Sequence, residues 1–324
     1  MKAYPYRTPA VIAFLLLFQG CAHMSRDRIL RQNVTAIKDE TRVLAVYEPW
    51  FGHPSHISVG YSSSDPAVVE RQIEQAKTLG ISGFVADWYG SREPLLDRNY
   101  ALLARTSAAK DFQLAMMYDE SAGENGEPAT EQTLVEFEQF HRTYLQADSP
   151  GRSAYLTYNG HPVIFIFPKG GHTDWNRVHA EVSSWNPTPV LISEYPQPEF
   201  GGAFDGLYAW INPGNKGWAA DGSNWGDDYL REFYRKMETQ YSGKITVGGA
   251  WAGFDDSKAS WGLNRHIAQR CGETFKQTLQ LSREYDTAEH PVPFLLIATW
   301  NDYEEGSAIE RGLAKCGSTV RSSS

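Results

Sequence analysis

Short apolar runs recur along the chain, separated by longer segments in which apolar residues follow helical spacing. Each run is rich in branched and aromatic residues and is bounded by turn residues, which is typical of a buried β-strand. We expect strands at residues 42–47, 81–87, 113–118, 161–167, 189–193, 206–211, 244–250 and 294–299. The dipeptide Asn159-Gly160 before the fourth run predicts a hairpin turn.

The segments between these runs predict amphipathic helices. Asp65 and Pro66 form a typical helix start, with an N-cap acceptor followed by proline in the first turn. Val69, Ile73 and Ala76 then fall on one face. Alternation of strands and helices over roughly 270 residues predicts an α/β fold, a single (β/α)8 TIM barrel at residues 41–314. We expect residues 315–324 to be a flexible tail.

Acidic and aromatic residues follow the ends of most of the expected strands. In a barrel these ends converge on one face, where the loops carry the chemistry. We therefore expect a single substrate cleft on that face. The residues expected to contact substrate there are Trp50, His56, Asp87, Trp88, Tyr118, Asp119, Glu194, Trp210, Asp255 and Asp256.

The last expected strand leads into a stretch that mixes acids with aromatic residues. Aromatic faces bind the apolar side of a sugar ring, and carboxylates bind its hydroxyls or protonate its leaving group. A carbohydrate site explains this mixture, whereas a solvated acidic loop, the alternative, has no need of the aromatic residues. The residues of this stretch that we expect in the site are Trp300, Asn301, Asp302, Tyr303, Glu305 and Glu310.

This stretch resembles two glycoside hydrolase families. Residues 300–305, Trp-Asn-Asp-Tyr-Glu-Glu, are similar to the Trp-Asn-Asp-Tyr-Gly-Glu signature of family 71, the α-1,3-glucanases. The run to residue 310 resembles the Asn-Glu-Trp-His-Glu-Gly-Thr-Gln-Ile-Glu motif of family 99, the endo-α-mannosidases. Residues 60–90, 204–208 and 253–256 are also similar to family 99. The resemblance implies a barrel that cleaves α-mannan or α-glucan.

The resemblance also implies the catalytic pair. Glu305 would be the general acid/base, and Asp302 the base that acts on water or on the 2-hydroxyl of the sugar, since two carboxylates commonly divide these tasks. Family 99 has Glu at the position of Asp302. We expect Glu304 to be a solvated neighbour and Asn301 to bind a sugar hydroxyl or hold Glu305. We expect Glu310 on the first turn of a following helix, with a structural or substrate-orienting role.

Composition favours a carbohydrate partner over a nucleic acid. The 324 residues carry a formal net charge of -9 without a basic patch, and they include ten Trp and seventeen Tyr. No Cys/His cluster has metal-ligand spacing, so we expect neither metal nor cofactor. A cation held by Asp87, Asp255 and Asp256 is the alternative. We expect a monomer that binds an oligo- or polysaccharide.

The N-terminus predicts export. Lys2 and Arg7 precede a short apolar segment, residues 11–18, so residues 1–20 have the pattern of a signal peptide. The apolar segment is too short to form a stable transmembrane helix. Gly20-Cys21 resembles a bacterial lipobox, in which Cys21 is lipidated. We expect a polar tether at residues 21–40 and a lipoprotein of the periplasm or outer membrane, attached to the membrane only through Cys21. Plain secretion is the alternative.

Two further functions compete with hydrolysis: a non-catalytic surface barrel that binds glycan, and a barrel associated with polysaccharide biosynthesis. Retention of both motif acids favours the enzyme, and export argues against biosynthesis from cytoplasmic nucleotide sugars. Cys271 falls at helical spacing with Ile267, Phe275 and Leu279, which predicts a buried free thiol. A disulfide with Cys316 is the alternative.

Overall fold

Eight parallel strands form a closed barrel in the computed structural model, which describes residues 30–37, 40–90, 92–120, 127–168, 172–194, 198–212 and 225–313. The barrel strands are β1 (Arg42–Tyr47), β2 (Gly83–Trp88), β3 (Gln113–Asp119), β5 (His161–Phe167), β6 (Val190–Glu194), β7 (Gly206–Tyr208), β8 (Ile245–Trp251) and β11 (Phe294–Ala298). They follow one another around the ring, and the pairing of β3 with β5 completes it. The predicted (β/α)8 fold is confirmed.

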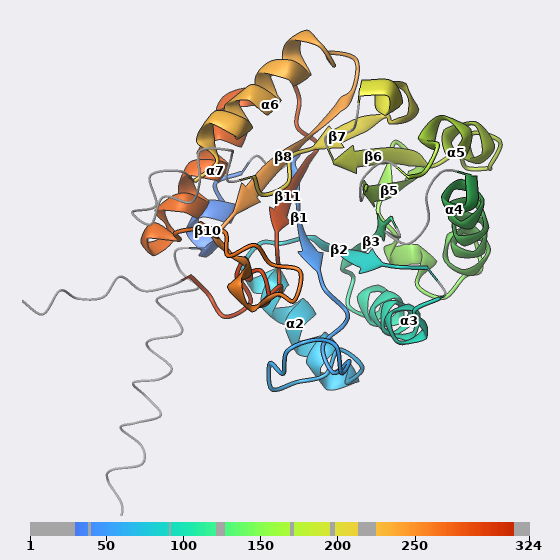
Figure 1. Cartoon of the computed structure of the whole chain (residues 1–324), viewed down its shortest axis with the longest axis horizontal. Coiled ribbons are helices and arrows are strands. Elements are labelled where there is room, and N and C mark those ends of the chain that lie inside the picture. Colours follow the sequence, from blue (N-terminus) through green and yellow to red (C-terminus); the bar gives the residue numbers. More distant parts are fainter. Residues whose placement is uncertain are drawn as a thin grey trace, which may run out of the picture.

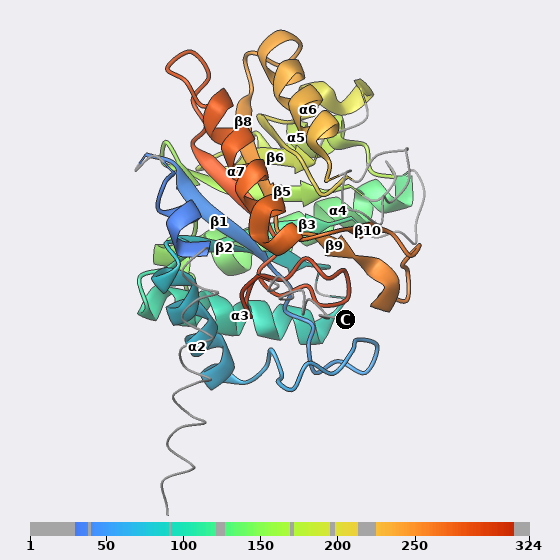
Figure 2. The same ribbon diagram turned by 90° about the vertical axis from the view of Figure 1, so that its left-hand side faces the viewer.

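Helices lie around the outside of the strands (Figure 1). They are α2 (Pro66–Thr78), α3 (Pro94–Ala109), α4 (Glu127–Phe140), α5 (Trp175–Val182), α6 (Asp227–Thr239) and α7 (Glu273–Tyr285). Figures 1 and 2 show α6 and α7 side by side on one flank. Between β6 and β7 a 3₁₀-helix, Pro198–Ala203, takes the place of an α-helix. Of the described helices, none combines the length and apolar character that a membrane span requires.

Shorter elements accompany the barrel strands and their helices. They are a π-helix after α4 (His141–Leu145), 3₁₀-helices at Arg152–Ala154, Asp256–Lys258 and Arg270–Gly272, and the strands β4 (Thr157–Tyr158), β9 (Phe254–Asp255) and β10 (His266–Ile267). β4 pairs with β5 through the predicted turn, in which Asn159 and Gly160 have φ of 51° and 85°. The predicted start of α2 is also confirmed, because the Asp65 side chain accepts a hydrogen bond from the backbone N–H of Ala67 at 2.9 Å.

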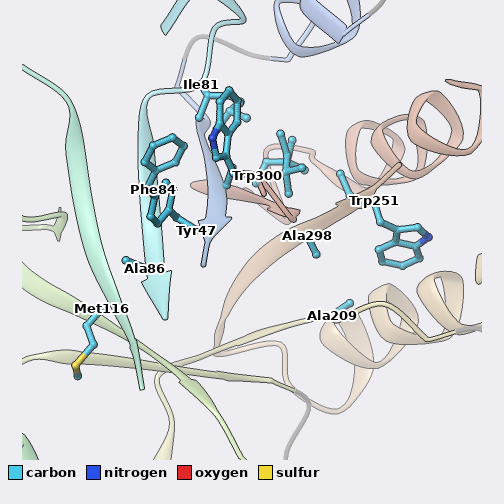
Figure 3. Close-up of a cluster of buried hydrophobic side chains, with 14 of the residues drawn as sticks. Tyr47, Ile81, Phe84, Ala86, Met116, Ala209, Trp251, Ala298 and Trp300 are labelled. Carbon is cyan, nitrogen blue, oxygen red and sulfur yellow. The ribbon is translucent and has the colours of Figure 1, made fainter. Parts of the chain in front are cut away.

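The alternation of side chains along each strand divides the core into two parts. On β1, Leu44 and Val46 point into the barrel, whereas Ala45 and Tyr47 point outward to the helices. Figure 3 shows part of the outer cluster, where Tyr47 packs against Phe84 of β2 with ring centroids 5.0 Å apart. This alternation continues to the strand ends and therefore decides which terminal residues face the barrel mouth.

Three predictions about segments outside the barrel strands are wrong in the described residues. No helix follows β11 up to residue 313, where the chain is irregular. Part of the expected tether forms a helical turn at residues 30–34, and its Leu30 and Val34 are buried in the outer core. Cys271 precedes α7 in a left-handed conformation, with φ of 58°, and it is disulfide-bonded rather than a free thiol. Its partner cysteine, like Cys21, lies outside the described residues.

The first and last strands are joined beyond their ends by one side chain. Oδ1 of Asn301 accepts a hydrogen bond from the backbone N–H of Glu48 at 2.8 Å, and Nδ2 of Asn301 donates to the carbonyl of Glu48 at 2.9 Å. Asn301 is fully buried. The side-chain amide of Asn301 thus satisfies both the backbone N–H and the backbone carbonyl of Glu48. This pair of hydrogen bonds fixes the loop after β11 against the end of β1.

We predict that Asn301→Ala lowers the free energy of unfolding by about 2–4 kcal/mol, because two buried backbone groups lose their partners. Chemical denaturation measures this change. Gln280→Ala, on the exposed face of α7, is the control and should shift the unfolding free energy by less than about 0.5 kcal/mol. An Asn301→Ala protein as stable as the parent would show that water replaces the amide at no cost.

Candidate active site

A cleft of about 600 Å³ opens where the barrel strands end. Its lining combines acids with aromatic and apolar side chains: Glu48, Trp50, His56, Asp87, Tyr89, Met117, Asp119, Phe167, Glu194, Trp210, Ile211, Phe254, Trp261, Arg265, Asp302 and Glu305. Eight residues that the sequence predicts for the site are in this set. They are Trp50, His56, Asp87, Asp119, Glu194, Trp210, Asp302 and Glu305.

Asp302 is held in a tight turn that brings two acids to the cleft. Its Oδ1 accepts hydrogen bonds from the backbone N–H groups of Glu304 and Glu305, at 3.0 and 2.9 Å. Its own N–H donates to Oγ1 of Thr299 at 2.8 Å. Asp302 is buried, and burial together with the negative charge of Glu305 raises its pKa well above the usual value of an Asp carboxyl. Asp302 is therefore harder to ionise than an isolated Asp carboxyl.

Glu305 is positioned from the other side by an excursion of the chain after β8. Nε1 of Trp261 donates to Oε1 of Glu305 at 3.0 Å, and the backbone N–H of Asp255 donates to the Glu305 carbonyl at 2.7 Å. The excursion that carries Trp261 lies between β9 and β10. An ion pair of 2.7 Å between Arg265 and the buried Asp256 ties its two ends together. A charge-stabilising donor thus reaches Glu305 from a distant part of the sequence.

Glu48 lines the cleft, close enough to other acids there for their charges to act on it. It follows β1 and continues the inward positions of Leu44 and Val46. It is only 4% exposed, and its Oε2 has no hydrogen-bond partner among the described residues. Burial raises the pKa of Glu48 well above the usual range, and the charges of Asp87 and Asp302 add to the effect.

Glu194 lies at the end of β6 and also has a raised pKa. Burial and the charge of Asp119 raise the pKa of Glu194 to about 7. At neutral pH Glu194 is therefore partly protonated, whereas an ordinary surface glutamate is ionised.

His56 contributes to the cleft through a pair that the sequence did not predict. Its Nδ1 lies 2.7 Å from Oε2 of Glu304, and the backbone N–H of Ile57 donates to Oε1 of the same carboxylate at 3.2 Å. Glu304 is only 2% exposed, so the prediction of a solvated neighbour is wrong. The His56 ring stacks on Trp50 with centroids 4.7 Å apart. Glu304 thus orients His56 and, through it, one wall of the cleft.

Four of the predicted aromatic and amide contacts lie outside the cleft. Trp88 and Tyr118 are on the outward positions of β2 and β3, where they contact helices: Nε1 of Trp88 donates to Asp97, and the hydroxyl of Tyr118 donates to Glu136. Trp300 is fully buried against Phe84, as Figure 3 shows. Asn301 binds the Glu48 backbone instead of a sugar or Glu305. Their predicted role as substrate contacts is therefore wrong.

The four remaining predicted residues lie outside the cleft and make structural contacts: Glu310, Tyr303, Asp255 and Asp256. Glu310 is 6% exposed and accepts hydrogen bonds from the hydroxyls of Tyr61 and Tyr303, at 2.9 and 2.7 Å, and from the Gln72 side chain. It therefore holds the loop after β11 on α2, and neither it nor Tyr303 lines the cleft.

Asp255 and Asp256 serve the excursion after β8. Asp255 caps the backbone N–H of Ser257, and Asp256 is occupied by Arg265. Neither side chain lines the cleft. In the part of the chain that the structure describes, no group of three or more His, Cys, Asp or Glu side chains is arranged to hold a metal ion.

Sequence reasoning missed half of the lining. Glu48, Tyr89, Met117 and Phe167 continue the inward alternation of their strands, a signal that the sequence contains. The others depend on how loops fold over the barrel mouth: Ile211, Phe254, Trp261 and Arg265.

Solved structures of glycoside hydrolases have a barrel fold similar to this one. No protein-family model and no curated protein matches the chain. Two solved structures of a family 99 endo-α-mannosidase from Bacteroides thetaiotaomicron superpose on it with TM-scores of 0.63 and 0.64 at 15% identity, covering 87% and 86% of this chain and 90% of theirs. A structure described as a glycoside hydrolase-like protein has a TM-score of 0.61 at 14% identity and covers 85% of this chain and 88% of its own. At such identity the likeness establishes a shared barrel fold.

We predict that Glu194→Gln stabilises the protein at pH 8 but not at pH 4. Because the folded-state pKa is about 7 against an ordinary 4.5, the folded chain holds a proton that the unfolded chain has already released. The stability associated with that proton is complete below pH 4.5 and is lost as the pH rises through 7. The amide avoids this loss, which amounts to about 1–3 kcal/mol.

Thermal denaturation of both proteins across this pH range measures the difference. A stability gain of equal size at pH 4 and pH 8 would show that ionisation of Glu194 is not its cause.

Proposed function

We propose that this protein is a glycoside hydrolase that cleaves α-linked glycans, with Asp302 and Glu305 as its catalytic residues. The observation that carries the proposal is the turn at the end of β11, which presents both carboxyl groups to one aromatic-lined cleft. The fold shared with family 99 endo-α-mannosidases supports it. An α-mannan or α-glucan is the corresponding substrate.

The geometry suits acid–base division of labour. Cleavage needs a proton for the departing oxygen and electron supply at the anomeric carbon. A protonated carboxyl group meets the first need and an ionised one meets the second, so two carboxyl groups in one cleft can divide the tasks. Glu305 receives a hydrogen bond from Trp261, which limits its rotation. We assign proton transfer to the leaving group to Glu305, and assistance to water or to the sugar 2-hydroxyl to Asp302.

The cellular location of the protein is also part of the proposal. An apolar export segment followed by Gly20-Cys21 is typical of a bacterial lipoprotein. We place the barrel in the cell envelope, in the periplasm or at the outer membrane, anchored through lipid on Cys21. Such a location gives access to extracellular or periplasmic glycan.

We predict that Glu305→Gln abolishes cleavage of α-glycans but spares aryl glycosides with good leaving groups, which need no proton. Asp302→Asn should impair both substrate classes by about 10²–10⁴-fold, because electron supply is needed whatever leaves. Release of reducing ends from a panel of α-mannans and α-glucans, and of phenol from the aryl glycosides, measures these rates.

Glu289→Gln is the matched control. This exposed acid precedes β11 at the opposite end of the same strand, so its variant should keep the parent rate within a few-fold. Glu304→Gln cannot serve as a neutral control because Glu304 is buried against His56. If the parent and all variants bound glycan and none cleaved it, the protein would be a glycan-binding barrel instead.

A further inference from the structure

Trp261 is an exposed aromatic side chain at the cleft. It is a lining residue, yet 45% of its surface is exposed. Among the described residues, two other large apolar side chains are exposed, Val135 on α4 and Leu263, which follows Trp261 in the same excursion. A single exposed apolar residue is common on protein surfaces and needs no functional explanation. Trp261 differs because the chain around it is held in place.

The excursion after β8 is anchored on the buried carboxylate of Asp256. This carboxylate accepts hydrogen bonds from the backbone N–H groups of Leu263 and Arg265, at 3.1 and 2.6 Å, and from Nε of Arg265 at 2.7 Å. The turn is also tight, since a Cβ at Gly262 would lie 1.8 Å from the backbone carbonyl oxygen of Asp256. The backbone beside Trp261 is thus fixed, and the exposure of its side chain is a property of the folded excursion.

The indole of Trp261 is oriented by contacts at its edge and leaves part of the ring open. Its Nε1 donates to Oε1 of Glu305 at 3.0 Å. The rings of Trp50 and His56 lie nearly perpendicular to it, at 77° and 72°, with centroids 6.4 and 6.2 Å away. No aromatic ring of the described residues stacks in parallel on Trp261. The exposed part of the indole therefore remains available to the apolar side of a sugar ring.

We propose, on the basis of the hydrolase function above, that Trp261 forms an additional sugar-binding subsite, which holds the part of the glycan that departs on cleavage. Glu305 is the residue assigned to protonate the departing oxygen, so the leaving group must lie beside Glu305. Trp261 contacts that same carboxylate and extends from it to the surface. A sugar on the indole is thus the one that follows the cleaved bond. The substrate is an oligo- or polysaccharide rather than a glycoside of a small aglycone.

A narrower role for Trp261 is to orient Glu305 alone. That role requires the indole N–H, whereas the subsite requires the aromatic ring. The two roles predict different behaviour for Trp261→Phe, which keeps an aromatic face and loses the N–H. Trp261→Ala loses both. Because Trp261 is partly exposed, both variants should fold, and thermal denaturation checks that they do.

The first test measures affinity without cleavage. Isothermal titration calorimetry uses α-1,3-linked glucooligosaccharides and α-linked mannooligosaccharides of two to five residues. The proteins carry Asp302→Asn, which slows cleavage and retains an oxygen that can accept the two backbone hydrogen bonds of the turn. Adding Trp261→Ala should weaken binding of the longer oligosaccharides by about tenfold. Adding Trp261→Phe should weaken it by less than about threefold, and adding Val135→Ala, the matched exposed control on α4, should leave it unchanged.

The second test places the subsite on the leaving-group side. It compares cleavage of the same oligosaccharides with cleavage of α-mannosyl and α-glucosyl fluorides, from which no sugar departs. Trp261→Ala should lower kcat/KM for oligosaccharides by about tenfold or more and leave the fluorides within about threefold of the parent. Trp261→Phe should restore KM for the oligosaccharides, while its kcat reports the loss of the hydrogen bond to Glu305.

Three results would overturn the subsite. They are absence of oligosaccharide binding, equal binding by the Trp261→Ala protein and its parent, and an equal loss of affinity in the Phe and Ala variants. A loss of activity on the fluorides as large as that on the oligosaccharides would refute the leaving-group side. Failure of the hydrolase function looks different, because the parent would then bind oligosaccharide through Trp261 and release no reducing ends.

Discussion

The hydrogen bonds between Asn301 and Glu48 connect the chemistry of the cleft to the closure of the barrel. β1 and β11 are neighbours in the ring, and the side chain of Asn301 extends their association beyond the last paired residues, Ala45 and Ile297. This contact places the backbone of Glu48 beside the turn that carries Asp302 and Glu305. Three acids from opposite ends of the sequence therefore share one site, although 253 positions separate Glu48 from Asn301.

The barrel was predictable because its pattern is local and repeated. Strand-type runs and amphipathic helices alternate, and β11 was placed to within one residue at its end. The weak points of that prediction are segments without such a pattern. The 3₁₀-helix before β7 and the irregular chain after β11 have too little apolar periodicity to be distinguished from helices or loops by sequence alone.

At the site, position along a strand matters more than residue type. Asp87 and Asp119 face the cleft, whereas their neighbours Trp88 and Tyr118 face the helices, because successive side chains point to opposite sides. Strict use of this alternation would have rejected both aromatic residues and selected Glu48. It could not have found Trp261, Glu304 or Glu310, whose roles depend on contacts that loop folding creates between distant segments.

The same carboxylates that suit the cleft for catalysis are unfavourable for the stability of the fold. Each buried acid at the barrel mouth loses hydration, and each ionised neighbour raises the cost of ionising the next. The barrel tolerates these local costs because apolar side chains inside the ring and beneath the helices stabilise the fold. The acids at the mouth can therefore be selected for what they bind, since the stability of the fold depends on other residues. Trp261 illustrates the result, because its indole N–H donates to Glu305, the residue to which the proposed reaction assigns proton transfer.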